Sequence, residues 1–189
     1  DVVAAAGSGL VLMEQSDETG ATSWTPSPGA LPTFPSTIRD LETVDFDHDG
    51  DLDLLVVGDF GARLLRNDGA GARVDKDGNL QPRGAWGDAS EEATLPAGAF
   101  TWCGVEDFAG DNDVDLLFGG PGGAHLMDSL RRGLFEDIGA AACGGRAFPR
   151  EPAVADIDGD GRPDLFVPSA TGSRGLRQRP EGGFDEVAI

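Results

Sequence analysis

Residues 45–53 read Asp45-Phe46-Asp47-His48-Asp49-Gly50-Asp51-Leu52-Asp53, and this acidic stretch occurs twice more in the chain. The last copy is Asp156-Ile157-Asp158-Gly159-Asp160-Gly161-Arg162-Pro163-Asp164. The middle copy is Asp107-Phe108-Ala109-Gly110-Asp111-Asn112-Asp113-Val114-Asp115. We name them acidic loops 1 (45–53), 2 (107–115) and 3 (156–164), and number their positions from the first residue. All three have Asp at positions 1, 5 and 9, so the chain contains an internal repeat.

Each acidic loop is followed by short runs that are typical of β-strands. An apolar run comes directly after the loop, and a second run starts ten residues after its last Asp. An aromatic residue stands 20 residues after the last Asp of loops 2 and 3, at Phe135 and Phe184. The second runs are Arg63–Asn67, His125–Ser129 and Arg174–Gln178. Short strands at this spacing, about four in every ~50 residues, indicate the blades of a β-propeller.

We therefore predict an all-β protein made of four-stranded antiparallel blades. The whole chain, 1–189, is expected to form one propeller segment, with a partial blade at 1–40 and blades at approximately 41–98, 99–150 and 151–189. Asp1 matches position 9 of an acidic loop, so we expect about three and a half blades of a larger propeller. An insertion is predicted at 74–97, where Asp77-Gly78-Asn79 indicates a tight turn.

The loops and the strands that follow resemble the FG-GAP/VCBS repeats of integrin α-chain propellers and of many secreted bacterial proteins. Phe118-Gly119-Gly120-Pro121 and Arg63-Leu64-Leu65-Arg66-Asn67-Asp68-Gly69 add to the resemblance. It implies that each acidic loop joins the innermost strand of a blade to the next strand and binds Ca²⁺.

The residues of the loops themselves also favour calcium. Ca²⁺ takes six to eight oxygen ligands, and alternate carboxylates in a tight loop point inward, with a backbone carbonyl at position 7 and a sharp turn at position 6. Loops 1 and 3 are predicted to bind one ion each, and a degenerate site in loop 2 is left open. The predicted ligands are Asp45, Asp47, Asp49, Asp51 (carbonyl) and Asp53 in loop 1; Asp107, Asp111, Asp113 and Asp115 in loop 2; and Asp156, Asp158, Asp160, Arg162 (carbonyl) and Asp164 in loop 3.

Loop 2 is the weaker match, because Ala109 removes the carboxylate at position 3 and Asn112 replaces the turn glycine. Asn tolerates a left-handed backbone, so the turn is expected to survive. His48, at position 4 of loop 1, is expected to point away from the ion.

An EF-hand, a different metal or a simple turn motif fits the acidic loops less well. An EF-hand needs Glu at position 12, where this chain has Val56, Phe118 and Val167. Magnesium demands tighter geometry, and zinc prefers nitrogen and sulfur. Aspartates often only cap turns. Two carboxylates ~4 Å apart, however, repel by about 4 kcal/mol at an effective dielectric near 20, which a divalent cation relieves.

The composition limits the possible functions. There are 34 acidic against 14 basic residues, a formal net charge of −20, which argues against nucleic acid and anionic membranes as partners. The apolar runs are too short to span a membrane.

We therefore expect a non-enzymatic, calcium-stabilised propeller segment that serves as a protein-interaction or assembly scaffold. Plentiful free calcium favours an extracellular, cell-surface or periplasmic location. The alternative is part of a carbohydrate-active or lectin-like propeller, with a glycan as ligand. With no Tyr and only His48 and His125 as histidines, catalysis in this segment is not expected.

A few further residues carry open questions. Cys103 and Cys143 form either one disulfide or two small buried side chains. Phe108 and Phe166 are expected to pack between blades, whereas Trp24 lies in what looks like a Pro-rich connector. The long insertion, with Trp86 and Leu95-Pro96, is predicted either to contact a partner or to form a covering flap without one.

Overall fold

The computed structural model describes residues 2–16, 22–26, 31–67, 73–74, 80–81, 86–170 and 172–187. Asp1 and the predicted turn at 77–79 lie outside these residues. Within the described residues every element except one is a β-strand, and the exception is the single helical turn α1 (Gly139–Ala142). The predicted all-β class is therefore confirmed.

All described strand pairs are antiparallel, and within a sheet the paired strands are usually consecutive in the chain. The exception is β6, which pairs with β9 (Trp86–Asp88), because β7 (Arg73–Val74) and β8 (Leu80–Gln81) form a small two-stranded sheet of their own. Besides this hairpin, three sheets have four strands and one has three. The four-stranded sheets are β4 (Ile38–Val44), β5 (Asp53–Gly58), β6 (Gly61–Asn67) and β9; β10 (Trp102–Glu106), β11 (Asp115–Gly120), β12 (Gly123–Ser129) and β13 (Phe135–Asp137); and β14 (Ala153–Ala155), β15 (Asp164–Val167), β16 (Arg174–Gln178) and β17 (Phe184–Val187). The three-stranded sheet is β1 (Val2–Ala6), β2 (Gly9–Ser16) and β3 (Ser23–Pro26).

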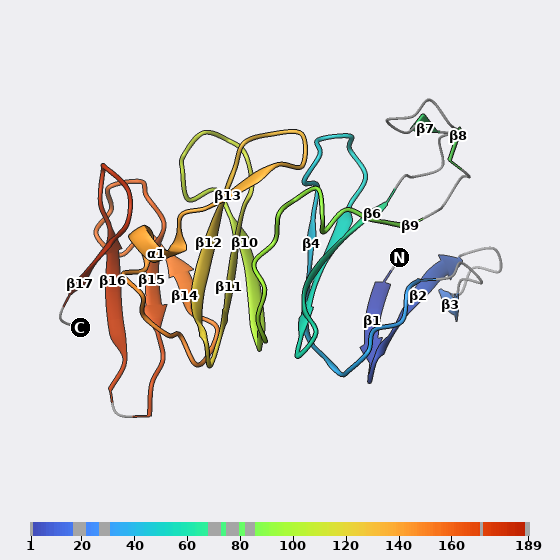
Figure 1. The fold of residues 1–189 in the computed structure, drawn as a ribbon, viewed down its shortest axis with the longest axis horizontal. Coiled ribbons are helices and arrows are strands. Elements are labelled where there is room, and N and C mark those ends of the chain that lie inside the picture. The colour runs from blue at the N-terminus through green and yellow to red at the C-terminus, as the bar shows by residue number, and fades with distance from the viewer. Residues whose placement is uncertain are drawn as a thin grey trace.

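Figure 1 shows these four sheets standing side by side in chain order, with the loops between first and second strands of the four-stranded sheets at one end. Each four-stranded sheet is a blade of the predicted type. We refer to them as blade A (β4, β5, β6, β9), blade B (β10–β13) and blade C (β14–β17).

The cores lie between the blades, because successive side chains of a strand point to opposite faces. On β11, Leu116 and Phe118 belong to the core shared with blade A, whereas Leu117 belongs to the core shared with blade C. All three are at most 2% exposed. The apolar run after an acidic loop is therefore buried on both faces, which explains why it lacks alternation.

A close approach between neighbouring strands explains one glycine. Trp102 pairs with Gly119, and a Cβ at Gly119 would lie 1.8 Å from Trp102 Cζ2. The Trp102 ring is buried, and its Nε1 donates a hydrogen bond to Phe148 O at 2.8 Å. Trp102 is therefore a packing residue of the core between blades B and C.

Two expectations from the sequence are corrected, and one open alternative is decided. Trp24 lies in strand β3 rather than in a connector, and its side chain is exposed. Phe166 is 37% exposed, unlike Phe108, which packs edge-on against Phe184 between blades B and C as predicted. Both cysteines are buried free thiols in different cores, so the disulfide alternative is not formed.

Candidate metal centres

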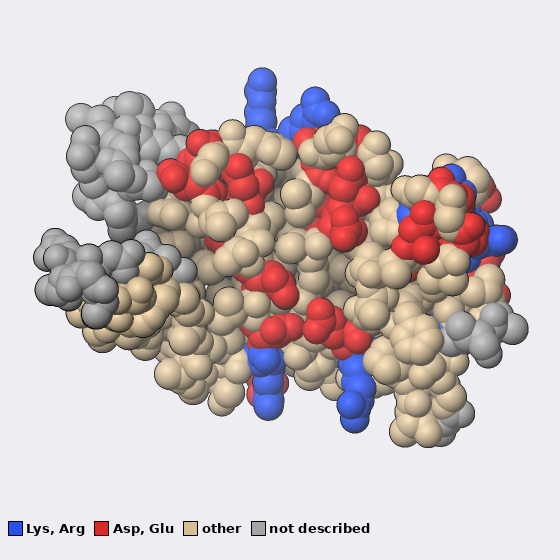
Figure 2. Space-filling model, turned by 180° about the vertical axis from the view of Figure 1, so that it is seen from behind, with Lys and Arg blue, Asp and Glu red and all other residues tan. Residues whose placement is uncertain are grey.

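The three acidic loops lie at the same end of their blades, each between the first strand and the second. Figure 2 shows acidic side chains gathered in patches along this edge of the row of sheets. Positions 4 and 6 of every loop have a left-handed backbone. The residues at position 6 are Gly50 (φ 91°), Asn112 (φ 67°) and Gly161 (φ 87°), so the predicted role of Asn112 as a turn residue is confirmed.

The aspartate at position 1 organises each loop from inside. In loop 3, Asp156 Oδ1 accepts hydrogen bonds from the N–H groups of Gly159 and Asp160, and its Oδ2 accepts one from Gly161. Asp45 accepts from the residues at positions 5 and 6, and Asp107 from those at positions 4, 5 and 6. The aspartate at position 5 accepts in turn from the N–H at position 7 in all three loops.

The aspartate at position 9 has a different role, which is the same in all three blades. Asp53, Asp115 and Asp164 are at most 1% exposed. One carboxylate oxygen accepts the N–H at position 2, and the other accepts the N–H at the end of the third strand. These third-strand residues are Asn67, Ser129 and Gln178. Position 9 therefore fastens the loop to the blade.

Carboxylates converge in loops 1 and 3 but not in loop 2. In loop 1, ligand atoms of Asp45, Asp47 and Asp49 all lie within 4.8 Å of one another. In loop 3, those of Asp156, Asp158 and Asp164 do so. Among the described residues, loop 2 contributes no such group of three, which agrees with its missing carboxylate at Ala109.

Several predicted ligands lie outside these two groups. Asp53 lies outside the loop 1 group, although Asp164, which accepts the same backbone hydrogen bonds, belongs to the loop 3 group. Asp160 turns its carboxylate to the guanidinium of Arg162. Asp51 and Arg162, at position 7, were predicted to bind the ion through their backbone carbonyls. The structure shows their N–H groups donating to the carboxylate at position 5. Their part in metal binding stays a prediction.

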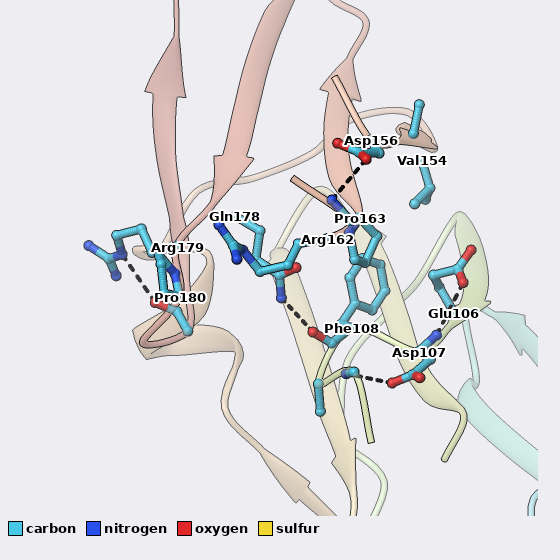
Figure 3. Close-up of a pocket in the computed structure, with 15 residues that line it drawn as sticks. Glu106, Asp107, Phe108, Val154, Asp156, Arg162, Pro163, Gln178, Arg179 and Pro180 are labelled. Carbon is cyan, nitrogen blue, oxygen red and sulfur yellow. Dashed lines mark hydrogen bonds between the residues drawn. The ribbon is translucent and has the colours of Figure 1, made fainter. Parts of the chain in front are cut away.

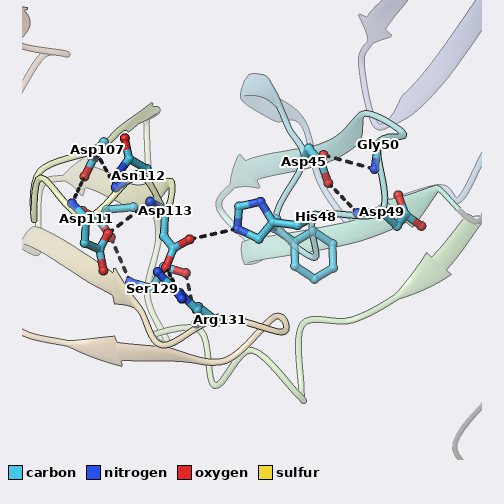
Figure 4. Close-up of polar contacts among 12 residues, drawn as sticks. Asp45, His48, Asp49, Gly50, Asp107, Asp111, Asn112, Asp113, Ser129 and Arg131 are labelled. Atoms are coloured by element: carbon cyan, nitrogen blue, oxygen red, sulfur yellow. Dashed lines mark hydrogen bonds and ion pairs between the residues drawn. The ribbon is translucent and has the colours of Figure 1, made fainter.

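In loop 2, a contact between blades replaces the convergence of carboxylates. Asp113 is 5% exposed; its Oδ1 lies 3.2 Å from His48 Nε2, and its Oδ2 lies 2.5 Å from Arg131 Nε. Figure 4 shows His48 reaching from loop 1 to Asp113 of loop 2, while Arg131 approaches from the β12–β13 turn. His48 thus points away from loop 1, as predicted. Sequence reasoning missed Arg131, because its contact with Asp113 joins residues 18 apart and has no counterpart in the other repeats.

The pKa shifts follow from burial. Burial raises the pKa of Asp53 to about 7, and the charges of Asp47 and Asp49 add to the rise. Burial also raises the pKa of Asp115 to about 6. Backbone hydrogen bonds lower the pKa of Asp156, which keeps this exposed carboxylate ionised. A cation in loop 1 would therefore favour the charged form of a carboxylate that is costly to ionise without it.

The donor sets of loops 1 and 3 fit calcium. They consist only of carboxylate oxygens, with no imidazole or thiol within the groups, which disfavours zinc. The loops are exposed and bent at two left-handed positions, a setting that suits the flexible coordination of Ca²⁺ better than the strict octahedron of Mg²⁺. Loop 2 does not fit a metal, because among the described residues it brings no three carboxylates together.

The remaining histidine is held within blade B. His125 Nδ1 lies 2.7 Å from Asp137 Oδ2, and its ring meets Phe100 edge-on. His125 is on strand β12, as predicted, opposite Phe118 on β11. No helix in the described part of the chain has the length and apolar character needed to cross a membrane.

Comparison with known proteins gives a family match and weak structural likenesses. A search of curated proteins returned no match. A solved structure of an Agrocybe aegerita lectin, described as recognising non-reducing terminal N-acetylglucosamine, aligns with a TM-score of 0.40 and 15% sequence identity. The alignment covers 98% of this chain and 61% of that chain, so this chain spans about three fifths of that lectin's length. We draw no conclusion from so weak a likeness.

The family match falls on the second and third acidic loops and the strands between them. Residues 107–167 match the model of the FG-GAP-like repeat. The matched segment runs from acidic loop 2 through strand β15, and so includes acidic loop 3. This match confirms the predicted resemblance to FG-GAP repeats for residues 107–167.

Proposed function

We propose that the chain is a non-enzymatic, calcium-stabilised propeller segment that serves as an extracytoplasmic scaffold for protein interaction or assembly. The observation that carries the proposal is the convergence of three carboxylates in each of loops 1 and 3. Three like charges this close are unfavourable without a counterion. Both groups include positions 1 and 3 of the acidic loop, which supports a common ligand.

Calcium would stabilise these blades by tying the exposed part of a loop to its buried base. In loop 3, the group combines exposed Asp156 and Asp158 with Asp164, the first residue of β15. An ion held by all three links the tip of the loop to the strand. Because it binds only the folded state, it adds RT ln(1 + [L]/Kd), about 2.7 kcal/mol at 100 times Kd.

An interaction role is supported by the insertion in blade A. A cavity of about 620 Å³ lies between the β5–β6 turn and the segment that contains Leu95 and Pro96. Its lining combines Phe60 with the charged Arg63 and Glu91. Arg63 lies 6.0 Å from the centre of the Phe60 ring. An apolar and charged surface of this kind suits a protein partner.

A non-enzymatic role is supported by the scarcity of general bases, because the chain has no Tyr and only two histidines. His48 contacts Asp113, and His125 contacts Asp137.

The test is thermal unfolding in calcium and in EGTA, with the bound ions counted by native mass spectrometry. We expect two Ca²⁺ per chain and a rise of several degrees in the melting temperature, since about 1 kcal/mol shifts a domain of this size by ~2–4 °C. Magnesium at the same concentration is the control and should give a smaller rise. No calcium bound and no shift in melting temperature would refute the proposal.

A further inference from the structure

A buried aspartate at position 7 distinguishes acidic loop 2 from the other two loops. Position 7 is Asp51 in loop 1 and Arg162 in loop 3, and both residues are only partly buried. In loop 2 it is Asp113, whose side chain is 8% exposed. Removing a carboxylate from water is costly unless a cation or hydrogen bonds compensate it. Loop 2 therefore favours a positive charge at a place where loops 1 and 3 have no buried carboxylate.

Arg131 supplies a positive charge at this place, from the β12–β13 turn. Its Nε lies 2.5 Å from Asp113 Oδ2. The hydrogen bond to Asp113, together with the charges of Asp113 and Asp111, raises the pKa of the Arg131 guanidinium. Asp111 stands at position 5 and is one of the predicted calcium ligands of loop 2. The guanidinium therefore acts on the carboxylates that an ion in loop 2 would need.

The other two repeats have no arginine at the matching place. Arg131 stands two residues after the third-strand residue that bonds to position 9, and the corresponding residues are Gly69 in blade A and Pro180 in blade C. Loop 2 is also the loop with Ala109 at position 3, where loops 1 and 3 have Asp. The loop that lacks one carboxylate ligand is thus the loop whose blade provides a cationic side chain.

The two junctions between blades differ in the same way. At the junction of blades A and B, His48 and Arg131 both contact the carboxylate of Asp113 (Figure 4). At the junction of blades B and C, Gln178 Nε2 donates a neutral hydrogen bond to Phe108 O of loop 2 (Figure 3). A charged contact is therefore not a general requirement for stacking one blade on the next.

Loop 3 also has arginine contacts, but they fall on more exposed carboxylates. Arg162 contacts Asp160, and Arg177 Nη1 lies 3.8 Å from Asp158 Oδ2. The side chains of these two aspartates are 26% and 33% exposed, so water also solvates their charge. Three carboxylates still converge in loop 3. An arginine near an acidic loop is thus compatible with a cation site when the carboxylates it contacts are accessible.

We propose that Arg131 is the built-in cation of acidic loop 2, and that its guanidinium closes this loop to Ca²⁺. An ion in loop 2 would stand near a charge of the same sign, and like charges repel. The proposal rests on calcium binding by loops 1 and 3, and it adds a division within the chain. Calcium stabilises blades A and C, whereas blade B uses a side chain in its place.

The experiment counts bound calcium ions by native mass spectrometry at saturating calcium. Ala109→Asp restores the carboxylate at position 3, and it suits the fold because Ala109 is exposed. Arg131→Met removes the guanidinium. We expect two ions in the unaltered chain and in each single variant, and three ions in the double variant Ala109→Asp/Arg131→Met.

Two further double variants, each combined with Ala109→Asp, are the matched controls. Arg132→Met removes the adjacent arginine, which is also exposed and has the same left-handed backbone, and the count should stay at two. Arg131→Lys keeps the positive charge and should also leave two ions. If Arg131→Met does not fold, Arg131→Gln takes its place, because its amide keeps a donor for Asp113 without the charge.

Thermal unfolding of the same variants gives a second readout. Calcium should raise the melting temperature of Ala109→Asp/Arg131→Met at least ~2 °C more than that of the unaltered chain, since it gains a third stabilising ion. In Arg131→Met alone, the rise caused by calcium should be the same as in the unaltered chain, because loop 2 holds no ion in either.

The possible failures are distinguishable in these counts. A third ion in Ala109→Asp alone, or only two ions in a folded Ala109→Asp/Arg131→Met, would overturn the role of Arg131 and leave the calcium sites of loops 1 and 3 intact. A count of zero in the unaltered chain would instead refute the proposed calcium-stabilised scaffold, and the role of Arg131 with it.

Discussion

Acidic loops 1 and 3 differ from acidic loop 2 in only part of their chemistry. All three share the hydrogen bonds made by the aspartates at positions 1, 5 and 9, and all three have a left-handed residue at position 6. Only loops 1 and 3 bring three carboxylates together among the residues that the structure describes. In loop 2, Asp113 is instead paired with His48 and Arg131. The backbone hydrogen bonds that build the loop are therefore common to all three copies, whereas the convergence of carboxylates is found in loops 1 and 3.

The largest expected effect comes from the shared position 9. Asp115→Ala would leave the buried N–H groups of Phe108 and Ser129, and the part-buried N–H of Ala109, without this acceptor. At ~1–3 kcal/mol for each unsatisfied group, the free energy of unfolding should fall by about 3 kcal/mol or more. Urea denaturation in EGTA measures it, with Asp111→Ala as the exposed control. A loss below about 0.5 kcal/mol would contradict the structural role of position 9.

The next effect concerns position 3, where loop 2 has Ala109. Asp47→Ala and Asp158→Ala copy the loop 2 residue into loops 1 and 3, and each should reduce the calcium count from two to one. Each should also remove a calcium-dependent stabilisation of about 2.7 kcal/mol at 100 times Kd. The reverse variant, Ala109→Asp, should add a third ion if position 3 alone separates the loops. Native mass spectrometry decides between these outcomes, and an unchanged count in Asp158→Ala would refute the assignment of loop 3.

The pH dependence offers a third comparison between the loops. Without calcium, Asp53 has its pKa raised to about 7 and Asp115 to about 6, against an ordinary value of 3.8. At a pH between the ordinary pKa and the raised pKa of each carboxyl, the folded state keeps a proton that the unfolded state has lost. The free energy of unfolding therefore falls as pH rises from about 4 to about 7. Melting temperatures in EGTA across this range measure the fall.

Variants assign the pH effect to the two loops. Asp53→Asn should remove the fall between about pH 6 and 7 and about half of the fall between about pH 4 and 6, whereas Asp115→Asn should remove only the other half between about pH 4 and 6. Calcium should weaken the part due to Asp53, because an ion in loop 1 favours the ionised carboxylate. Stability that instead rises from about pH 4 to 7 in EGTA would show that other groups dominate.

The smallest effect is expected at the contact between loops 1 and 2. Arg131→Met removes an exposed guanidinium whose pKa is raised by its hydrogen bond to Asp113. Surface ion pairs contribute little, so the melting temperature should fall by only about 2 °C. Arg132→Met, the adjacent residue with the same left-handed backbone, is the control. A double-mutant cycle with Asp113→Asn should show coupling, and additive effects would show that the contact is not formed in solution.

The sequence alone was enough for the features that depend on local spacing. The strands after each loop, the turn at Asn112 and the carboxylate groups of loops 1 and 3 follow from residues within one repeat. A hydrogen bond or a turn that joins residues a few positions apart repeats whenever the residues repeat. Position 9 was foreseen as acidic and inward-pointing, but its backbone hydrogen bonds to the third strand were not.

Only the tertiary structure decided which faces are covered and which groups meet between blades. Leu117 and Phe166 occupy the same place, two residues after position 9, yet Leu117 is 2% exposed and Phe166 is 37% exposed. The difference is that blade C covers Leu117, whereas no described element covers Phe166 in the same way. Likewise, the contacts of His48 with Asp113 and of Gln178 with Phe108 span 65 and 70 residues. Spacing within one repeat cannot encode such contacts, because they depend on how the blades stack.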